Sequence, residues 1–181
     1  MKNFRRAIFL DRDGVINRAY IEDGKPLSAK NLDSLEILPG VREATSLLNA
    51  AGFHLCIVTN QPDISRGTVR LEDVEKIHSY LECELDIDEI RMCIHDDLDC
   101  CDCRKPKSGM LISCAMEHNI DLKKSYMIGD RWRDIDAGKA VGCKTIYIDY
   151  GYNERKPISF DYSVESLLEA SGIILRSIDD D

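Results

Sequence analysis

The segment that decides the fold is Ala7-Ile-Phe-Leu-Asp-Arg-Asp-Gly14, in which four apolar residues run directly into two aspartates. Such a short apolar run is typical of a strand that is buried on both faces of a parallel sheet. Similar runs alternate with amphipathic stretches along the chain. This alternation predicts an α/β fold, doubly wound, with a mostly parallel sheet and helices on both faces. The expected strands are Ala7–Leu10, His54–Val58, Ile90–Ile94, Ser125–Ile128 and Thr145–Ile148, and the expected helices are Val41–Ala51, Leu71–Leu85, Ser108–His118, Asp134–Ala140 and Ser163–Ala170.

The length and net charge of the chain limit the classes of protein to which it can belong. A chain of 181 residues can bury one full hydrophobic core, so we expect a single domain over residues 1–181. The net charge of −9 argues against nucleic acid or an anionic membrane as a partner. No apolar run approaches the roughly 20 residues that cross a bilayer, and the start lacks a secretory hydrophobic segment. We therefore expect a cytoplasmic monomer with eight reduced or metal-bound cysteines and a frayed acidic end at 179–181.

Polar side chains follow three of the expected strands. Asp11 and Asp13 follow the first, Thr59 to Gln61 end the second, and Asp130 follows the fourth. Ligands of open α/β sheets bind outside the carboxyl ends of the strands, so these residues are expected to form one site. Three aspartates suit Mg²⁺, and Asp11 could attack phosphorus while Asp13 handles the leaving-group proton. On the spacing of the two aspartates alone, a solvated acidic turn remains the simpler explanation.

Four segments, taken in order, resemble the motifs of the haloacid dehalogenase (HAD) superfamily of phosphohydrolases. The resemblance rests on the whole ordered set, because each segment by itself is degenerate. The role of Asp134 stays open: it could orient Lys105 or the metal waters, or it could be the N-cap of the next helix. The segments are Phe9–Asn17, Val58–Gln61, Lys105–Lys107 and Ile128–Asp134.

The resemblance implies a role for each matched residue. Asp11 would be the nucleophile, and Asp13 the general acid and then the general base. Thr59 and Lys105 would bind the transferring phosphoryl group. Mg²⁺ would be held by the Asp11 carboxylate, the backbone carbonyl of Asp13 and Asp130. Phosphoryl transfer depends mainly on positioning and charge neutralisation, which this set of residues can supply.

A cluster of cysteines predicts a second metal. Cys93-Ile-His95 and Cys101-Asp-Cys103 offer three thiolates and one imidazole, a complete tetrahedral set with no open position. Such a set is typical of structural zinc, so we expect a zinc-stabilised loop. Cys100 also forms a C-x-x-C pair with Cys103, and the residues alone do not exclude it as a ligand.

The segment from Cys93 to Pro106 is similar to the zinc loop of two phosphatase groups, which act on heptose 1,7-bisphosphate and on histidinol phosphate. This resemblance implies that Cys101 and Cys103, rather than Cys100, bind zinc. It also implies that Arg104 contacts the phosphate side of the substrate. The expected substrate-binding residues are Arg12, Asn60, Gln61, Arg104 and Lys105.

The choice of substrate depends on two further segments. Asn60–Gly67 resembles the heptose group, whereas the short spacer between His95 and Cys101 is closer to the histidinol-phosphate group. Pro62-Asp63 departs from both. We expect conversion of D-glycero-D-manno-heptose 1,7-bisphosphate to the heptose 1-phosphate, with histidinol phosphate or another sugar phosphate as the alternatives.

The lengths of the insertions predict how the site is covered. Only 25 residues separate Asp13 from Pro39, and 32 separate Asn60 from Cys93, which is too few for a cap domain with its own core. Loops, including Ala19–Asp33, should cover the site. Two other classes stay open: an inactive zinc-stabilised binding module, and a mutase or phosphotransferase that passes the phosphoryl group to another hydroxyl.

Overall fold

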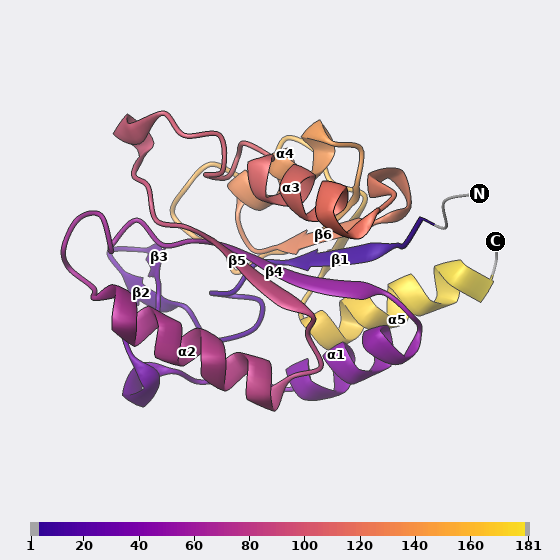
Figure 1. Ribbon diagram of the computed structural model, residues 1–181, viewed down its shortest axis with the longest axis horizontal. Coiled ribbons are helices and arrows are strands. Elements are labelled where there is room, and N and C mark those ends of the chain that lie inside the picture. Colours follow the sequence, from indigo (N-terminus) through magenta and orange to yellow (C-terminus); the bar gives the residue numbers. More distant parts are fainter. Residues whose placement is uncertain (1–3, 180–181) are drawn as a thin grey trace.

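A six-stranded parallel sheet runs through the centre of the molecule in the computed structural model, which describes residues 4–179 (Figure 1). The strand order is β5-β4-β1-β6-β7-β8, so the first strand lies inside the sheet, between β4 and β6. Because all these strands are parallel, their carboxyl ends meet at one edge. The strands are β1 (Ala7–Leu10), β4 (His54–Asn60), β5 (Glu89–Cys93), β6 (Tyr126–Gly129), β7 (Lys144–Ile148) and β8 (Tyr162–Val164).

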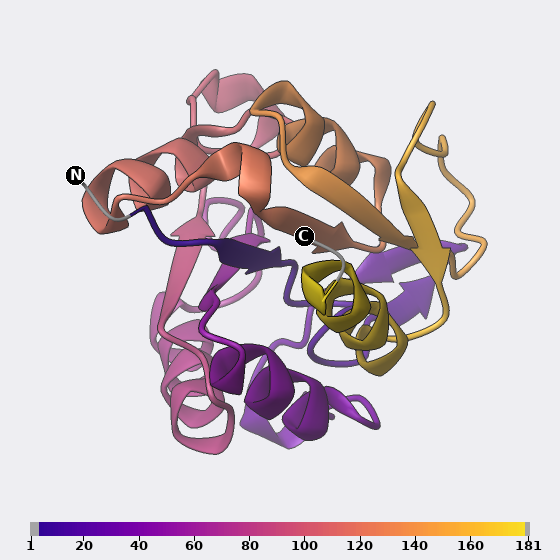
Figure 2. The same cartoon turned by 90° about the vertical axis from the view of Figure 1, so that its right-hand side faces the viewer.

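Helices cover both faces of the sheet, as the strand–helix alternation predicts. Figure 1 shows α3 and α4 above the sheet and α1, α2 and α5 below it. Alternate residues of β1 point to opposite faces, so Ile8 and Leu10 pack toward α1 and α5 while Ala7 and Phe9 pack toward α3. Figure 2 shows α1 and α5 side by side. The helices are α1 (Val41–Ala50), α2 (Leu71–Glu84), α3 (Gly109–His118), α4 (Trp132–Ala140) and α5 (Leu167–Asp179).

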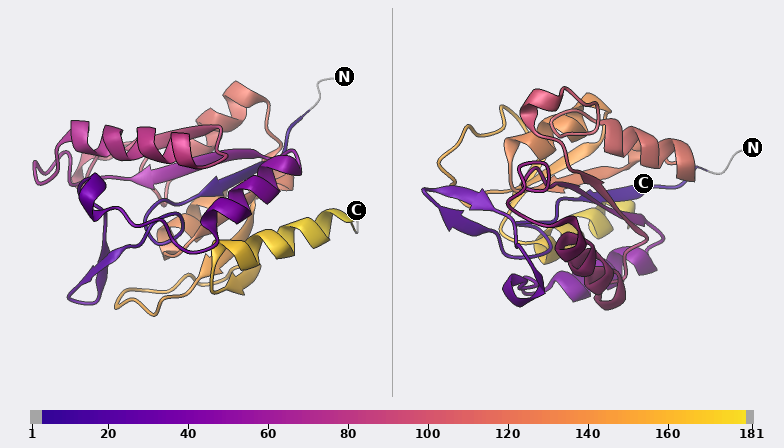
Figure 3. Two further views of the ribbon diagram at one scale, coloured as in Figure 1. Left: turned by 90° about the horizontal axis from the view of Figure 1, so that it is seen from below. Right: turned by 60° about the vertical axis from the view of Figure 1, so that its left-hand side comes forward.

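A short hairpin and three 3-10 turns complete the fold. The hairpin consists of β2 (Tyr20–Glu22) and β3 (Lys25–Leu27), and it projects from the body of the molecule (Figure 3). The turns are η1 (Leu32–Ser34), η2 (Asp97–Asp99) and η3 (Leu122–Lys124). The insertion between Asp13 and Pro39 therefore consists of one hairpin, one turn and loops.

The C-terminal part differs from the expectation. The predicted helix Ser163–Ala170 is wrong in its first half, because residues 162–164 form β8, which pairs with β7. The helix begins at Leu167 and continues to Asp179, so Asp179 belongs to α5 rather than to a frayed tail. Asp180 and Asp181 lie outside the described residues. In the described part of the chain, no helix has the length and apolar character needed to cross a membrane.

Candidate active site

The candidate site lies at the edge of the sheet where β1, β4 and β6 end. Asp11 follows β1, Thr59 lies near the end of β4, and Asp130 follows β6. Lys105 comes from the loop before α3, and Asp134 from the first turn of α4. A small pocket of about 50 Å³ opens here, and it is lined by Asp11, Asp13, Thr59, Asn60, Lys105, Arg131, Arg133, Asp134 and residues 26–28 of the hairpin region.

Lys105 is the central cation of the site. Its side chain is buried, and its Nζ lies 2.8 Å from Asp11 Oδ1 and 2.7 Å from Asp134 Oδ1. It also donates a hydrogen bond to the carbonyl oxygen of Val58. Burial lowers the pKa of Lys105, but the charges of Asp11 and Asp134 outweigh burial and raise the pKa above its ordinary value. Lys105 therefore stays an ammonium ion.

Asp11 is a carboxyl group in an environment that disfavours its charge. Burial and the nearby Asp134 carboxylate raise the pKa of Asp11 to about 6, although Lys105 opposes this shift. One oxygen, Oδ1, accepts hydrogen bonds from Lys105 Nζ and from the backbone N–H of Arg12. The side chain is thus held in one orientation at the floor of the pocket.

Asp130 adds a second buried carboxylate that is only partly satisfied. Its Oδ2 accepts a hydrogen bond of 2.7 Å from the Tyr152 hydroxyl, whereas Oδ1 has no hydrogen-bond partner among residues 4–179. Burial and the Asp11 charge raise the pKa of Asp130 well above its ordinary value. Oxygens of Asp11, Asp130 and Asp134 all lie within 4.8 Å of one another. This excess of buried negative charge, with an orphaned oxygen, fits a divalent cation with oxygen ligands.

Gly14 makes this arrangement possible. Its φ is +90°, and a Cβ built at this position would lie 1.9 Å from Asp130 Oδ2. A side chain here would therefore both strain the backbone and displace the Asp130 carboxylate. The site itself therefore requires glycine at this position, directly after Asp13.

The carboxylate of Asp13 is held by three side chains. Both of its oxygens lie within 3.1 Å of Arg12 Nη2, Asn17 donates to Oδ1 at 2.9 Å, and Gln61 donates to Oδ2 at 2.9 Å. Burial raises the pKa of Asp13, but the Arg12 charge and these hydrogen bonds outweigh burial, so the pKa lies below its ordinary value. Asp13 is therefore ionised in the free protein.

Two residues predicted to contact substrate contact the candidate catalytic groups instead. Arg12 is fully buried, and its guanidinium reaches Asp13 and, at 3.2 Å, His78 Nε2. Gln61 is also buried, and its amide bridges Asp13 and Thr59 Oγ1. Neither side chain lines the pocket, and both can orient the groups that do, Asp13 and Thr59.

Asn60 and Arg104 hold the loop that carries Lys105. The Asn60 amide donates to the backbone carbonyl of Lys105 and accepts from its N–H, at 3.0 and 3.1 Å. Arg104 donates to Asp97 Oδ1 at 2.8 Å and to the backbone carbonyl of His95 at 3.0 Å. Asn60 lines the pocket, whereas Arg104 does not line it and pairs with Asp97.

Asp134 fills one of the two roles that the sequence left open, the orientation of Lys105, and it is not the N-cap of α4. Its Oδ1 pairs with Lys105, so it does orient the cation of the site. Its Oδ2 accepts from the backbone N–H of Arg131, at the start of α4. The N-cap residue is Arg131, however, and Asp134 occupies the N3 position, so the N-cap interpretation is wrong by three residues.

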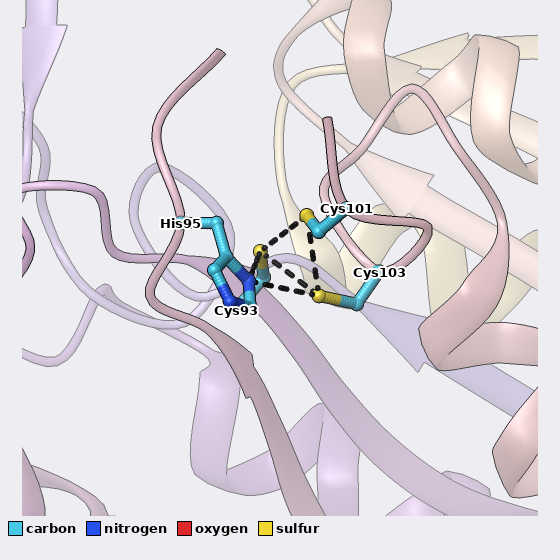
Figure 4. A group of neighbouring side chains, drawn as sticks. All are labelled: Cys93, His95, Cys101 and Cys103. Carbon is cyan, nitrogen blue, oxygen red and sulfur yellow. Dashed lines mark hydrogen bonds between the residues drawn. The ribbon is translucent and has the colours of Figure 1, made fainter. Parts of the chain in front are cut away.

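The four side chains of the cysteine cluster converge on one point (Figure 4). Cys103 Sγ lies 3.2 Å from Cys93 Sγ, 3.5 Å from Cys101 Sγ and 3.4 Å from His95 Nδ1. Ligands around a tetrahedral zinc with Zn–S bonds of about 2.3 Å lie about 3.8 Å apart, close to these separations. Cys100 is exposed and stays outside the cluster. The geometry thus fits a structural zinc ligated by the predicted four residues.

Several residues of the site were not predicted from the sequence. Arg131 and Arg133 line the pocket beside Asp134, and both lie in the segment Ile128–Asp134, whose two arginines were a usable signal. Asn17 lies at the end of the Phe9–Asn17 segment and could have been found in the same way. Tyr152 comes from the loop after β7, and no motif or spacing marks it.

Comparison with known proteins places this geometry in a family. A family model described as HAD-hydrolase-like matches residues 102–170. The chain is 34% identical over 190 aligned residues to the D-glycero-beta-D-manno-heptose-1,7-bisphosphate 7-phosphatase of Pasteurella multocida (strain Pm70), with 94% of this chain and 97% of that protein covered. It is 32% identical to the D-glycero-D-manno-heptose-1,7-bisphosphate 7-phosphatase of Thermosynechococcus vestitus, with 83% and 82% covered.

A solved structure supports the same relationship. The crystal structure of D,D-heptose 1,7-bisphosphate phosphatase from B. bronchiseptica, complexed with magnesium and phosphate, matches with a TM-score of 0.77 and 28% identity, covering 95% of this chain and 99% of that chain. The fold, the site and these relatives agree. The chain is a phosphatase and belongs to the HAD-like family that includes the heptose-1,7-bisphosphate 7-phosphatases.

Proposed function

We propose that the protein removes the 7-phosphate of D-glycero-D-manno-heptose 1,7-bisphosphate and leaves the heptose 1-phosphate. The observation that carries the proposal is the similarity to the Pasteurella multocida 7-phosphatase, which extends over 94% of this chain. The arrangement of Asp11, Lys105 and Asp130 at one strand edge supports the chemistry, because it combines a nucleophile with groups that neutralise phosphate charge.

Asp11 and Asp13 divide the reaction between them. An Asp11 carboxylate oxygen forms a bond to phosphorus while the bond from phosphorus to the sugar oxygen breaks, which gives an aspartyl-phosphate. Asp13 gives its proton to the leaving oxygen, then accepts a proton from the water that cleaves the aspartyl-phosphate. The low pKa of Asp13 suits its role as a base in the second step. The negative charge of bound substrate raises this pKa, so that Asp13 can carry the proton that it donates in the first step.

Lys105 and Thr59 bind the transferring phosphoryl group in this proposal. The Lys105 ammonium opposes the charge of the phosphoryl oxygens, and the Thr59 hydroxyl donates to one of them. Gln61 fixes the Thr59 hydroxyl and Asp13 relative to each other, through hydrogen bonds of 2.8 and 2.9 Å. Arg12 and Asn60 act through Asp13 and Lys105, as positioning residues.

Mg²⁺ is the cofactor that fits the buried oxygens of the site. The Asp11 and Asp130 carboxylates and the backbone carbonyl of Asp13 would hold it, and the unpartnered Asp130 Oδ1 supports this assignment. The crystal structure of the B. bronchiseptica relative is a complex with magnesium and phosphate. When bound, the cation neutralises charge on the transferring phosphoryl group.

The second phosphate of a bisphosphate needs its own cationic partner. Arg133 lines the pocket, and its guanidinium lies 3.2 Å from Asp97, which also binds Arg104. We assign Arg133 and Arg104 to the 1-phosphate. This phosphate would either displace Asp97 from the two arginines or bind them together with Asp97. The hairpin region, through residues 26–28, supplies the cover that a cap domain provides in other enzymes.

Substrate preference is tested by a phosphate-release screen. We expect the highest kcat/KM with the α- or β-anomer of heptose 1,7-bisphosphate, and ³¹P NMR of the product should show that the 1-phosphate remains. Arg133→Met should raise KM for the bisphosphate more than for heptose 7-phosphate, which lacks the second phosphate. A higher kcat/KM with histidinol phosphate or a hexose phosphate would contradict the proposed substrate, and transfer to another hydroxyl would identify a phosphotransferase.

Mg²⁺ affinity should decrease below about pH 6. The raised pKa values of Asp11, about 6, and Asp130 mean that protons compete with the cation for these oxygens. Each competing proton weakens binding by about tenfold per pH unit below its pKa. Isothermal titration calorimetry at pH 5, 6 and 7.5 measures the effect.

The Tyr152→Phe variant provides a control for this pH dependence. The Tyr152 hydroxyl lowers the pKa of Asp130 through its hydrogen bond, so its loss should shift the Mg²⁺ binding curve to higher pH. An Mg²⁺ affinity that is the same at pH 5 and pH 7.5 in the wild type would contradict the assignment of Asp11 and Asp130.

We propose one structural zinc bound by Cys93, His95, Cys101 and Cys103. Cys101→Ser should lose this zinc, then the order of the loop, and then activity, because the loop delivers Lys105 to the site. Cys100→Ser is the matched control, one residue away, and it should keep both zinc and activity. Metal analysis of the two purified variants decides the matter: zinc loss from Cys100→Ser alone would transfer the ligand role to Cys100.

A further inference from the structure

A second group of side chains of the kinds that bind metals lies at the other end of the sheet, far from the active site. We name it the amino-end cluster, and it consists of His54, Glu89 and His118, whose ligand atoms all lie within 4.8 Å of one another. His54 begins β4 and Glu89 begins β5, whereas Cys114 and His118 lie one turn apart on α3 and share a face of that helix. Glu89 Oε1 lies 3.0 Å from His54 Nε2, 3.2 Å from His118 Nε2 and 3.0 Å from Cys114 Sγ.

Hydrogen bonds alone account poorly for this convergence. A carboxylate oxygen has about two lone-pair positions, yet three potential donors crowd against Glu89 Oε1. The other oxygen, Oε2, is already paired with Arg91 Nε at 2.7 Å. The His54 and His118 rings lie with their centroids 4.4 Å apart, and the Nε2 atoms of both lie within 3.2 Å of the same oxygen, Glu89 Oε1. A cation between this oxygen and the two Nε2 atoms would replace crowded hydrogen bonds with bonds to one centre.

The second nitrogen of His54 supports the same interpretation. His54 is buried, and its Nδ1 has no hydrogen-bond partner in the described part of the chain. The nearest carboxylate oxygen, Asp88 Oδ2, lies 3.6 Å away. When a histidine binds a metal through Nε2, its Nδ1 carries a proton that is usually directed at a carboxylate. Asp88 is placed to receive that proton.

We propose that the amino-end cluster binds one zinc-class cation through His54 Nε2, His118 Nε2 and Glu89 Oε1. Two imidazoles and one carboxylate are a donor set that zinc accepts with water in the fourth tetrahedral position. His54 is buried, but His118 and Glu89 are partly exposed, which gives the ion a path from solvent. The ion would tie the end of α3 to β4 and to the edge strand β5.

The amino-end cluster is separate from the cysteine loop. Glu89 is the first residue of β5 and Cys93 the last. Four residues along a strand span roughly 13 Å, so one ion cannot serve both groups of ligands. Zinc bound to the amino-end cluster would therefore be additional to any zinc bound by the cysteine loop.

Metal content of the full-length protein tests the proposal. The wild type and variants are equilibrated with excess Zn²⁺, desalted and measured by mass spectrometry of the metal. Glu89→Gln and His118→Asn should each retain one zinc fewer per chain than the wild type. Cys83→Ser, which replaces an exposed cysteine outside both clusters, should retain the wild-type amount. Equal zinc content in all four proteins would overturn the proposal.

An anomalous diffraction measurement on the wild type keeps the test independent of how the variants fold. Crystals of the zinc-equilibrated protein are measured at the zinc absorption edge. We expect an anomalous peak between Glu89 Oε1 and His118 Nε2, in addition to any peak at the cysteine loop. Zinc should also raise the thermal unfolding midpoint of the wild type more than that of His118→Asn, because only the wild type can bind the second ion. An anomalous map without density at the amino-end cluster would refute the site.

Discussion

The Asp11→Asn variant is expected to lose turnover by roughly 10⁴-fold or more, the usual scale for removal of a nucleophile. The amide has no charged oxygen to attack phosphorus, and it is a poorer ligand for Mg²⁺. The fold should persist, because Lys105 keeps its ion pair with Asp134 and the neutral amide removes a carboxylate whose burial raises its pKa to about 6.

Three measurements separate loss of chemistry from loss of fold in this variant. Single-turnover phosphate release reports the chemical step, thermal unfolding reports the fold, and phosphorylated protein is sought by mass spectrometry after acid quench. The wild type should show the aspartyl-phosphate and Asp11→Asn should not. Asp86→Asn is the control, since it makes the same change at an exposed aspartate before β5. Magnesium-dependent hydrolysis by Asp11→Asn near the wild-type rate would exclude Asp11 as the nucleophile.

The strands that could be predicted are those with an apolar run, and most of them are buried on both faces. Ala7–Leu10 has the predicted bounds, and the four other expected strands lie within two residues of theirs, because a run of apolar side chains is their defining property. β8 was missed because it lies at the sheet edge, where Tyr162 and Ser163 are exposed and only Val164 is buried. The hairpin strands β2 and β3 have no buried side chain and therefore no hydrophobic signal.

The residues of the candidate site could be predicted better than their orientation. Strand ends bring Asp11, Thr59 and Asp130 together, and this follows from a parallel sheet alone. The direction of a long side chain depends on partners that are distant in sequence, and for this reason Arg12 was assigned to substrate although it is buried against Asp13. The approach of His54 to residues of α3 has the same origin, since no local spacing connects them.

Replacement of the buried lysine should affect both catalysis and stability. Lys105→Met removes the cation between Asp11 and Asp134 and leaves two carboxylates facing each other in a buried site. Loss of one partner of a buried ion pair typically costs about 3–5 kcal/mol in the free energy of unfolding. Turnover should fall as well, because the phosphoryl oxygens lose their ammonium partner.

The stability loss of Lys105→Met should depend on pH, and the sign follows from Asp11. Its pKa in the folded wild type is about 6, above the ordinary 3.8, and removal of Lys105 raises it further. A carboxyl group with a raised pKa binds its proton more tightly when folded, so its stabilising effect is complete below about pH 4 and is lost as the pH rises through the folded pKa. Urea unfolding of the metal-free proteins should therefore show a smaller difference in the free energy of unfolding between variant and wild type at pH 4.5 than at pH 7.5.

The control is Lys124→Met, at an exposed lysine of η3, which should show little difference from the wild type at either pH. A loss in Lys105→Met that is equal at both pH values would mean that Lys105 does not hold the charges of Asp11 and Asp134 in the folded protein.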